Sequence, residues 1–599
     1  MKIEADVHSI NALKDYFFVV PDYQREYVWK ADDHVEQFLN DIEAEYEPKE
    51  KEQHSYFIGS IILVGDGEYA VIDGQQRLTT IMLTLCAFRD RLKAKEDLGR
   101  NEKEYLKKVE ELLYEYDLGA KRSRYRLELQ YEDSHDYFRH RIDGKPYVGE
   151  RTASIGRMDE AYTTIEDHLG RWDDAELVER LHYFLMHVEL VVIESEDLGS
   201  ALKIFETINQ RGAGLNAMDL VKNLIFRKAP EGEFEKVKLI WKELMAALEA
   251  CGETDPLRYL RYFLMARYAD ELIREDGIYK WIISDKGKKV LGYEKDALGF
   301  AKAMLSAAKR YSEWVQATES KDDTGKHSAI ARIGMVNKLK SRQHLLLLMA
   351  LEEAFKPQDV EYLAAQVESY LFLHNVIGTQ SKYHERTFLD WAQKIRAIKN
   401  RKGLEAFASG AMLDAAKKEH KDFASDFVRL TIRNLSPNYR ISYVLGRLDS
   451  TLCKKAQQAE QTSKYYREFE VEHILPQTPR GPLPSEFADE EDYQASVAML
   501  GNALLIESTI NQALNKANDR GTDWYSKKCV EYIKSGVWSS KLMAAGFAIG
   551  KDTAVNRARD HYGFPFKEWN KKAIERHQKV MLELAFDTWT IGGKRFDTR

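Results

Sequence analysis

The sequence predicts a multidomain, mainly α-helical protein that begins with an α/β domain and ends with a small domain of two strands and a helix. Its 599 residues exceed what one hydrophobic core usually organises. Strand signals gather near the two ends, while helical spacing of apolar residues fills the middle. We therefore expect three domains, at 1–230, 231–435 and 436–599.

The first domain is expected to alternate strands with helices. Apolar runs at 15–21, 56–65 and 69–74 read as strands, and the stretch that starts at Leu78 reads as a long helix. Two further strands are expected at 121–130 and 186–195, and a helix follows at 200–212. This order predicts an α/β fold for residues 1–230.

Arg122, Arg124 and Arg126 alternate along one of these expected strands and so would share one face. Such a face is suited to track the DNA backbone. It is equally typical of an exposed basic edge that discourages sheet aggregation. The sequence leaves both interpretations open.

The middle of the chain, from Phe234 to Thr431, has apolar residues at three- and four-residue spacing and few strand signals, which predicts a helical connector. His374 and His384 lie within it. Because no acid stands near them at ligand spacing, we expect core or surface histidines rather than metal ligands.

The composition narrows the class of protein. No stretch approaches the roughly 20 apolar residues that span a bilayer, and the acidic start does not resemble a signal peptide, so we expect a cytoplasmic protein without membrane contact. The four cysteines form no Cys-x-x-Cys pair, which argues against a zinc ribbon. A net charge of -8 means that any nucleic-acid site is a local basic surface.

The stretch "FEVEHILPQT" at 469–478 places Glu472 beside His473 at the end of an expected strand. The later stretch "LGNALLIESTINQALNKA" reads as a second strand and a helix, and this order is that of the ββα-metal nucleases. There, a histidine acts as general base and a divalent ion offsets charge on the phosphate. His473 is the expected base, and Glu472 and Asn511 offer oxygens of the kind that Mg²⁺ or Mn²⁺ prefers.

Other polar residues complete this candidate catalytic set. Asn502 is expected to orient the ring of His473. Lys516, Lys527 and Lys528 are candidates for phosphate contact. The alternative is that Glu472 and His473 merely end a strand and that Asn511 is an exposed helix residue. The full set of motifs favours the nuclease.

A second constellation lies in "VIDGQQRLTT" at 71–80, where a strand gives way to a helix. Backbone N–H groups at a helix N-terminus favour phosphate, and Arg77 can form a fork with phosphate oxygens. The alternative is a helix cap with a structural salt bridge. The segments 20–30 and 205–223 contribute further polar residues. The candidate nucleotide-binding residues are Gln24, Arg25, Asp73, Gly74, Gln75, Gln76, Arg77, Asn209 and Arg211.

These motifs together resemble one known family, the GmrSD-type modification-dependent (type IV) restriction endonucleases. The Glu472–His473, Leu-Gly-Asn and Asn511 motifs, with the tail from Glu568 to Trp589, resemble its C-terminal His-Asn-His (HNH) nuclease domain. The three N-terminal segments resemble its ParB-like domain, which binds and hydrolyses a nucleoside triphosphate. Many relatives have Asp where Glu472 stands, and the longer carboxylate would alter metal preference.

The resemblance implies a DNA endonuclease of anti-phage defence that cleaves foreign, modified double-stranded DNA with an Mg²⁺ or Mn²⁺ HNH centre. It also implies regulation by a nucleoside triphosphate, whether GTP, ATP or another. Two alternatives stay open: a nucleotide-binding regulatory DNA-binding protein with an inactive nuclease domain, and a toxin-like nuclease that ignores modification. Because cutting both strands is simplest with two centres, we expect a homodimer.

Overall fold

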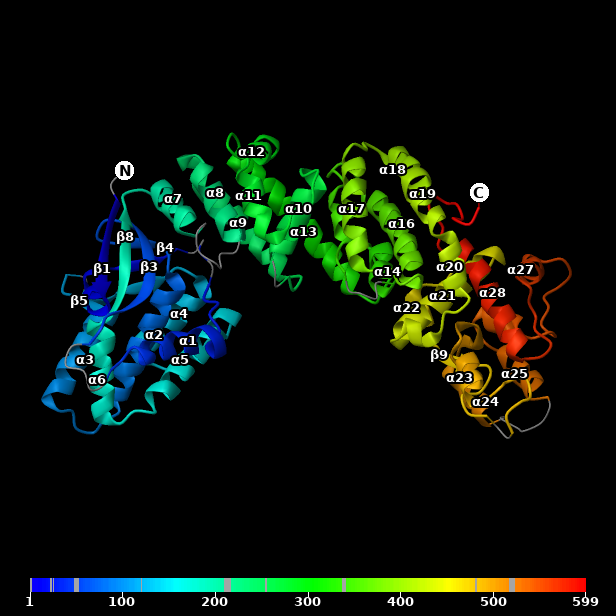
Figure 1. The fold of residues 1–599 in the computed structure, drawn as a ribbon, viewed down its shortest axis with the longest axis horizontal. Helices are drawn as coiled ribbons and strands as arrows, with labels where there is room; N and C mark the ends of the chain where they lie inside the picture. Colours follow the sequence, from blue (N-terminus) through cyan, green and yellow to red (C-terminus); the bar gives the residue numbers. More distant parts are fainter. Residues whose placement is uncertain are drawn as a thin grey trace. The chain divides into compact units, whose positions relative to one another are not determined.

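A computed structural model describes residues 3–598, except for 22–23, 25, 48–52, 120, 210–216, 254–255, 337–340, 480–481 and 517–522. The chain forms two compact units (Figure 1). The first contains residues 1–242 with 293–301, and the second contains 243–292 with 302–599. The structure is mostly helical with a small mixed sheet, which confirms the coarse fold class.

The first unit is built on a six-stranded sheet in the order β1-β8-β3-β4-β2-β7. Its strands are β1 (Ile3–Ser9), β2 (Phe18–Val20), β3 (Tyr56–Gly65), β4 (Tyr69–Asp73), β7 (Leu127–Leu129) and β8 (Val188–Ser195). A separate hairpin joins β5 (Tyr114–Asp117) to β6 (Arg122–Tyr125). β3 runs parallel to β8 and antiparallel to β4, so the sheet is mixed.

Helices of the first unit gather mainly on one side of this sheet (Figure 1). They are α1 (Glu36–Ala44), α2 (Gln75–Lys93), α3 (Arg100–Leu113), α4 (Glu132–Ile142), α5 (Ala153–Leu169) and α6 (Asp174–Met186), followed by α7 (Leu198–Asn209) and α8 (Ala217–Lys228). α2 is buried along nearly all of its length and contacts α3, α4 and α5. It therefore forms the centre of the core.

Most of the expected N-terminal elements are found where the apolar runs placed them, including β3, β4, α2 and β8. The strand expected at 121–130 is an exception, because it is broken at Arg126. The Arg126 side chain turns inward, where its Nε donates to the carbonyl of Glu111 at 3.1 Å and its Nη2 donates to Glu115 at 2.7 Å. The three arginines therefore do not share one exposed face.

The second unit begins in the helical connector. Its helices run from α9 (Phe234–Glu249), which starts in the first unit, through α10 (Pro256–Arg267), α11 (Ile278–Ile283), α12 (Asp285–Leu291), α13 (Ala297–Glu319), α14 (Ser328–Val336), α15 (His344–Met349), α16 (Pro357–Val376), α17 (Ser381–Arg396), α18 (Arg401–Phe407), α19 (Leu413–Lys418) and α20 (His420–Phe427). This confirms the helical middle. His374 and His384 are both buried in its core.

The C-terminal part of the second unit surrounds a two-stranded sheet. Its elements are α21 (Asn438–Lys455), α22 (Ser463–Tyr466), β9 (Glu470–His473), α23 (Glu490–Ala498), β10 (Ala503–Ile506), α24 (Ser508–Lys516), α25 (Trp524–Tyr532), α26 (Trp538–Leu542), α27 (Ala554–Tyr562) and α28 (Lys571–Thr588). Trp589, just after α28, stacks on Phe372 of α16 with ring centroids 3.5 Å apart. The two parts thus share one core.

None of the helices within the described ranges is both long and apolar enough to cross a membrane.

Candidate functional site

The first candidate site lies at the end of the β9–β10 sheet. The strands are antiparallel, with His473 opposite Ala503 and Glu472 opposite Leu504. β10 is buried throughout, and α24 begins two residues after it ends. The expected order of strand, strand and helix is therefore present, and it brings the two polar motifs together although thirty residues separate them in the chain.

His473 lies half-buried at the C-terminal end of β9. Nε2 of Gln477 approaches its two ring nitrogens at 3.3 and 3.4 Å. Burial lowers the pKa of His473, and the nearby Lys528 ammonium lowers it further, whereas Glu472 opposes the shift. A lowered pKa keeps the imidazole neutral near pH 7, which is the form that accepts a proton.

Glu472 is buried and points toward α25. Its Oε1 lies 2.5 Å from Nζ of Lys528 and accepts a hydrogen bond from the hydroxyl of Tyr532 at 3.2 Å. Lys528 also donates to the backbone carbonyls of His473 and Ile474. The sequence suggested Lys528 for phosphate contact, but the structure instead places it in a buried ion pair that holds the end of β9.

Asn502 is fully buried and is positioned by α28. A Cβ on the preceding residue, Gly501, would lie 2.7 Å from the carbonyl of Ile574, so only glycine permits this close packing. The Asn502 side chain accepts from the backbone N–H of Leu475 at 2.7 Å and donates to the carbonyl of Leu475 at 3.1 Å. It therefore contacts the backbone that follows His473, whereas we had expected it to orient the ring.

Asn511 lies on the first turns of α24 and faces β9. Its Nδ2 donates to Oε2 of Glu470 at 2.6 Å. Hydrogen bonds from Asn511 and Ser508 hold the pKa of Glu470 below its ordinary value. Because residues two apart share one face of a strand, Glu470 and Glu472 present two carboxylates on the side that α24 and α25 cover.

Over the part of the chain that the structure describes, no three His, Cys, Asp or Glu side chains form a metal-binding cluster. Two oxygens nevertheless lack hydrogen bonds to described residues, namely Oε2 of Glu472 and Oδ1 of Asn511. Mg²⁺ commonly takes one or two protein carboxylates and completes its shell with water and phosphate. The donor atoms therefore fit an ion of this kind.

The second candidate site lies in the first unit where β4 meets α2. Gly74 has φ of 89°, and a Cβ there would lie 2.5 Å from a methyl of Ile61, so the turn requires glycine. Gln76 is buried and holds the segment before Lys30: its Oε1 accepts from the backbone of Val28 at 2.8 Å and its Nε2 donates to the carbonyl of Glu26 at 2.9 Å. Gln75 is buried beside it.

Arg77 lies against the neighbouring strand β3. Its Nη1 donates to the carbonyl of Ser60 at 2.7 Å, and a Cβ on Gly59 would come within 2.8 Å of its Nη2. Burial lowers the pKa of Arg77, and the charge of Asp73 opposes that shift. Because the ordinary pKa of arginine is so high, the side chain stays cationic beside Asp73.

A third element, α8, also reaches this turn. Nζ of Lys222 lies 3.3 Å from Oε1 of Gln24, and Nε2 of Gln24 donates to the carbonyl of Ile72 at 3.2 Å. Lys222 is almost completely buried, and Oδ1 of its neighbour Asn223 is buried with no hydrogen-bond partner among the described residues. A buried cation next to the Asp73–Arg77 turn suits an anionic ligand.

Four expected site residues cannot be placed. Arg25, Arg211 and the side chains of Asn209 and Lys516 lie outside the described residues. Conversely, Glu470 and Lys222 lie at the two sites although neither is among the candidate site residues expected from the sequence. Glu470 stands two residues before Glu472, and this spacing in the sequence indicates that both carboxylates lie on one face of the strand. Lys222 lies in the polar segment 205–223, but its approach to Gln24 joins residues 198 apart in the chain and leaves no local signal.

Two family models match the chain. The model described as "GmrSD restriction endonuclease, N-terminal domain" matches residues 7–226, which include the Asp73–Arg77 turn. The model described as "GmrSD restriction endonucleases, C-terminal domain" matches residues 417–584, which include β9, β10 and α24. No curated protein matches the chain significantly.

Proposed function

Because the chain belongs to the GmrSD-type family of restriction endonucleases, we propose that it cleaves modified foreign DNA with a divalent-metal centre of the ββα-metal (HNH) type at Glu472, His473 and Asn511. The family makes it a restriction endonuclease with DNA as substrate. The observation that carries the finer proposal is the convergence of β9, β10 and α24, which brings Asn511 of α24 to Glu470 of the strand that also carries Glu472 and the half-buried His473.

The proposed reaction is hydrolysis of a phosphodiester. Neutral His473 accepts a proton from the attacking water, because its lowered pKa leaves the ring unprotonated near pH 7. Glu472 and Asn511 would hold the metal, which when bound offsets charge on the phosphate and the leaving oxygen. Asn502 and Lys528 keep the backbone after His473 in place.

We further propose that the first unit, as a ParB-like domain, binds and hydrolyses a nucleoside triphosphate at the Asp73–Arg77 turn and thereby regulates cleavage. Two cations support this: the half-buried Arg77 of α2 lies at the turn, and the buried Lys222 of α8, which lies 3.8 Å from Asp219, approaches it through Gln24. The N–H groups at the start of α2 add a partial positive charge. Regulation requires the ligand to bind two states of the protein with different affinity.

The test compares cleavage of modified and unmodified plasmid in Mg²⁺ or Mn²⁺ by wild type, His473→Ala and His561→Ala. Loss of the general base should slow cleavage by about a hundredfold or more. His561 is an exposed histidine of the same domain and serves as the control. Asn511→Ala should instead raise the concentration of Mg²⁺ needed for half-maximal cleavage.

The outcomes separate the competing functions. Full cleavage by a folded His473→Ala protein contradicts the proposed centre. Absence of cleavage by the wild type on every substrate favours a regulatory DNA-binding protein with an inactive nuclease domain. Equal cleavage of modified and unmodified plasmid favours a nuclease that ignores modification. Two-strand cuts at low enzyme concentration would support the proposed homodimer if gel filtration gives twice the chain mass.

A further inference from the structure

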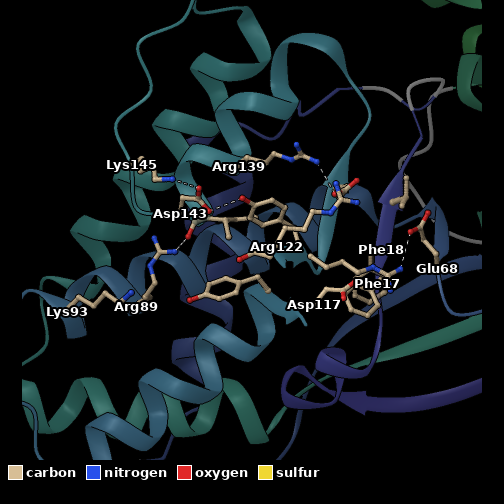
Figure 2. A pocket seen from close by; sticks show the side chains of 17 residues that line it. Phe17, Phe18, Glu68, Arg89, Lys93, Asp117, Arg122, Arg139, Asp143 and Lys145 are labelled. Carbon is tan, nitrogen blue, oxygen red and sulfur yellow. Dashed lines mark hydrogen bonds and ion pairs between the residues drawn. The ribbon is translucent and has the colours of Figure 1, made fainter. Parts of the chain in front are cut away.

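A cavity of about 860 Å³ lies in the first unit beside the β5–β6 hairpin (Figure 2). Its walls come from β2, the C-terminal half of α2, the hairpin and α4. It contains none of residues 73–77. Arg77 and Arg89 lie on α2, and twelve residues of helix separate them by about 18 Å. The cavity is therefore a site separate from the Asp73–Arg77 turn.

Cationic side chains outnumber carboxylates around this cavity. Six lysines and arginines line it: Arg89, Lys93, Arg122, Arg124, Arg139 and Lys145. The carboxylates are Glu68, Asp117, Glu128 and Asp143. Three of the cations are already paired: Arg89 with Asp90 and Lys93 with Glu110, both outside the cavity wall, and Lys145 with Asp143. The cations that face the cavity nevertheless favour an anionic ligand, because low-dielectric walls focus the field.

The cations of the cavity differ in whether they already form ion pairs within the protein. Arg124 pairs with Glu68 at 3.1 Å, and Arg139 pairs with Glu128 at 3.0 Å. Arg122 is exposed and forms no ion pair with any described residue. The Arg139 side chain is still 39% exposed beside Glu128. Both arginines therefore remain open to a ligand.

Flat surfaces complete the cavity. The guanidinium groups of Arg124 and Arg126 lie 3.6 and 4.2 Å from the ring centre of Phe17, so this ring is already covered by cations. Tyr114 and Tyr125 stand opposite each other in the hairpin, and the Tyr125 hydroxyl donates to Asp143 at 2.9 Å. Aromatic and guanidinium planes are the surfaces on which nucleobases stack.

We propose that this cavity binds a nucleoside phosphate, with the phosphate at Arg122 and Arg139 and the base against the aromatic side chains. Its volume lies within the range of small-molecule sites, so one nucleotide fits. A ligand without a ring would leave the tyrosines of the wall unused, and an uncharged one would leave Arg122 without an ion pair. The chemistry is shared by a free nucleotide and by a nucleotide turned out of a DNA duplex.

Binding of a nucleotide turned out of a duplex would connect the cavity to DNA restriction. This second possibility rests on the proposed function. A protein that inspects one base of a duplex must take it out of the stack, and a concave site receives it. Unpaired or damaged bases leave the stack most easily. The cavity would then serve the recognition of DNA by the first unit, whereas His473 serves cleavage.

The experiment measures binding by the full-length protein in EDTA, so that cleavage does not interfere. The probes are the four deoxynucleoside monophosphates, a labelled duplex with one unpaired nucleotide and the same duplex fully paired. Arg122→Glu should weaken binding by about tenfold or more, as expected for loss of a charge-assisted hydrogen bond. Ser123→Trp, which places a large ring in the cavity wall, should weaken it as well.

Lys103→Glu is the matched control, because Lys103 is an exposed cation of α3 that does not line the cavity. Tight binding of monophosphates points to a free nucleotide, and binding of the duplex with the unpaired nucleotide alone points to DNA. The proposal is overturned if the wild type binds no probe, if Arg122→Glu binds every probe like the wild type, or if Lys103→Glu loses as much affinity.

The design also separates this proposal from the nuclease assignment. His473→Ala should bind all probes like the wild type, because His473 lies in the other unit. A loss of binding in Arg122→Glu together with normal cleavage in His473→Ala would leave the cavity as a binding site while removing the proposed nuclease centre. Normal binding in Arg122→Glu with no cleavage in His473→Ala would support the nuclease centre and remove the cavity as a binding site.

Discussion

Nζ of Lys528 lies 2.5 Å from Oε1 of Glu472, in an ion pair whose side chains are only 7% and 9% exposed. A buried pair of this kind adds little net stability, but removal of one partner leaves an uncompensated charge. The pair also ties α25 to the strand that carries His473. Glu472 thus has a structural partner among the protein's own side chains, and a metal bound at its other oxygen would share the carboxylate with Lys528.

Lys528→Met is therefore expected to destabilise the C-terminal part of the chain by about 3–5 kcal/mol. Because Mg²⁺ can replace the missing cation beside Glu472, it should raise the melting temperature of the variant more than that of the wild type. Thermal melting with and without Mg²⁺ measures this. Lys527→Met, which removes an adjacent, more exposed lysine paired with Asp523, is the control. Equal Mg²⁺ shifts in all three proteins would argue against metal at Glu472.

Asn502→Ala should lose both stability and cleavage, and added metal should restore neither. Nδ2 of Asn502 donates to the carbonyls of Leu475 and Val497, and its Oδ1 accepts from Nε1 of Trp569 at 3.1 Å. Each buried partner left without a hydrogen bond costs about 1–3 kcal/mol. Melting temperature and cleavage are measured over a range of Mg²⁺. Recovery of cleavage at high Mg²⁺ would show that Asn502 acts through the metal instead.

Arg77→Ala should abolish hydrolysis of nucleoside triphosphate, whereas Arg91→Ala on the exposed part of the same helix should not. The reason is that Arg77 supplies a half-buried positive charge beside the turn. Phosphate release is measured for each common triphosphate, with and without DNA. If the wild type hydrolyses a triphosphate and Arg77→Ala hydrolyses it equally well, the nucleotide site lies elsewhere.

His374 and His384 predict a loss of stability in acid. Burial lowers the pKa of His374 to about 3 and that of His384 to about 4, below the ordinary value of 6.5. The folded state thus binds fewer protons than the unfolded state, so stability is complete above about pH 6.5 and falls as pH drops toward 4. Each histidine should lower the free energy of unfolding by about 3 kcal/mol at pH 4, because the unfolded state binds a proton that the buried ring does not.

The measurement is the melting temperature of wild type and His384→Asn between pH 7 and pH 4. The variant should lose less than the wild type over that interval, although it is less stable at pH 7. If the melting temperatures of both proteins fall equally with pH, His384 does not cause the loss of stability in acid.

Local patterns in the sequence predicted many of the elements but not the partners. β3, β4 and α2 follow from continuous apolar runs and a glycine turn, which act over a few residues. β1 was missed because its residues alternate with acids and a histidine, and it is stabilised by pairing with β8 almost two hundred residues away. Pairing at such a distance leaves no local signal.

For the candidate nuclease site too, the sequence predicted the secondary-structure elements but not the contacts between them. The order of Glu472–His473, Leu-Gly-Asn and Asn511 indicated two strands and a helix, which the structure contains. The individual contacts were not predictable, because they depend on how α25 and α28 pack. Lys528 reaches Glu472 across 56 residues, and Trp569 reaches Asn502 across 67.

The division of the chain into units also limits how such a gene can be rearranged. Residues 293–301 belong to the first unit although residues 243–292, which precede them, belong to the second. A single break anywhere between 242 and 302 thus leaves at least one half without a segment of its own core. We therefore expect that a single crossover in this stretch does not exchange either unit intact between related chains.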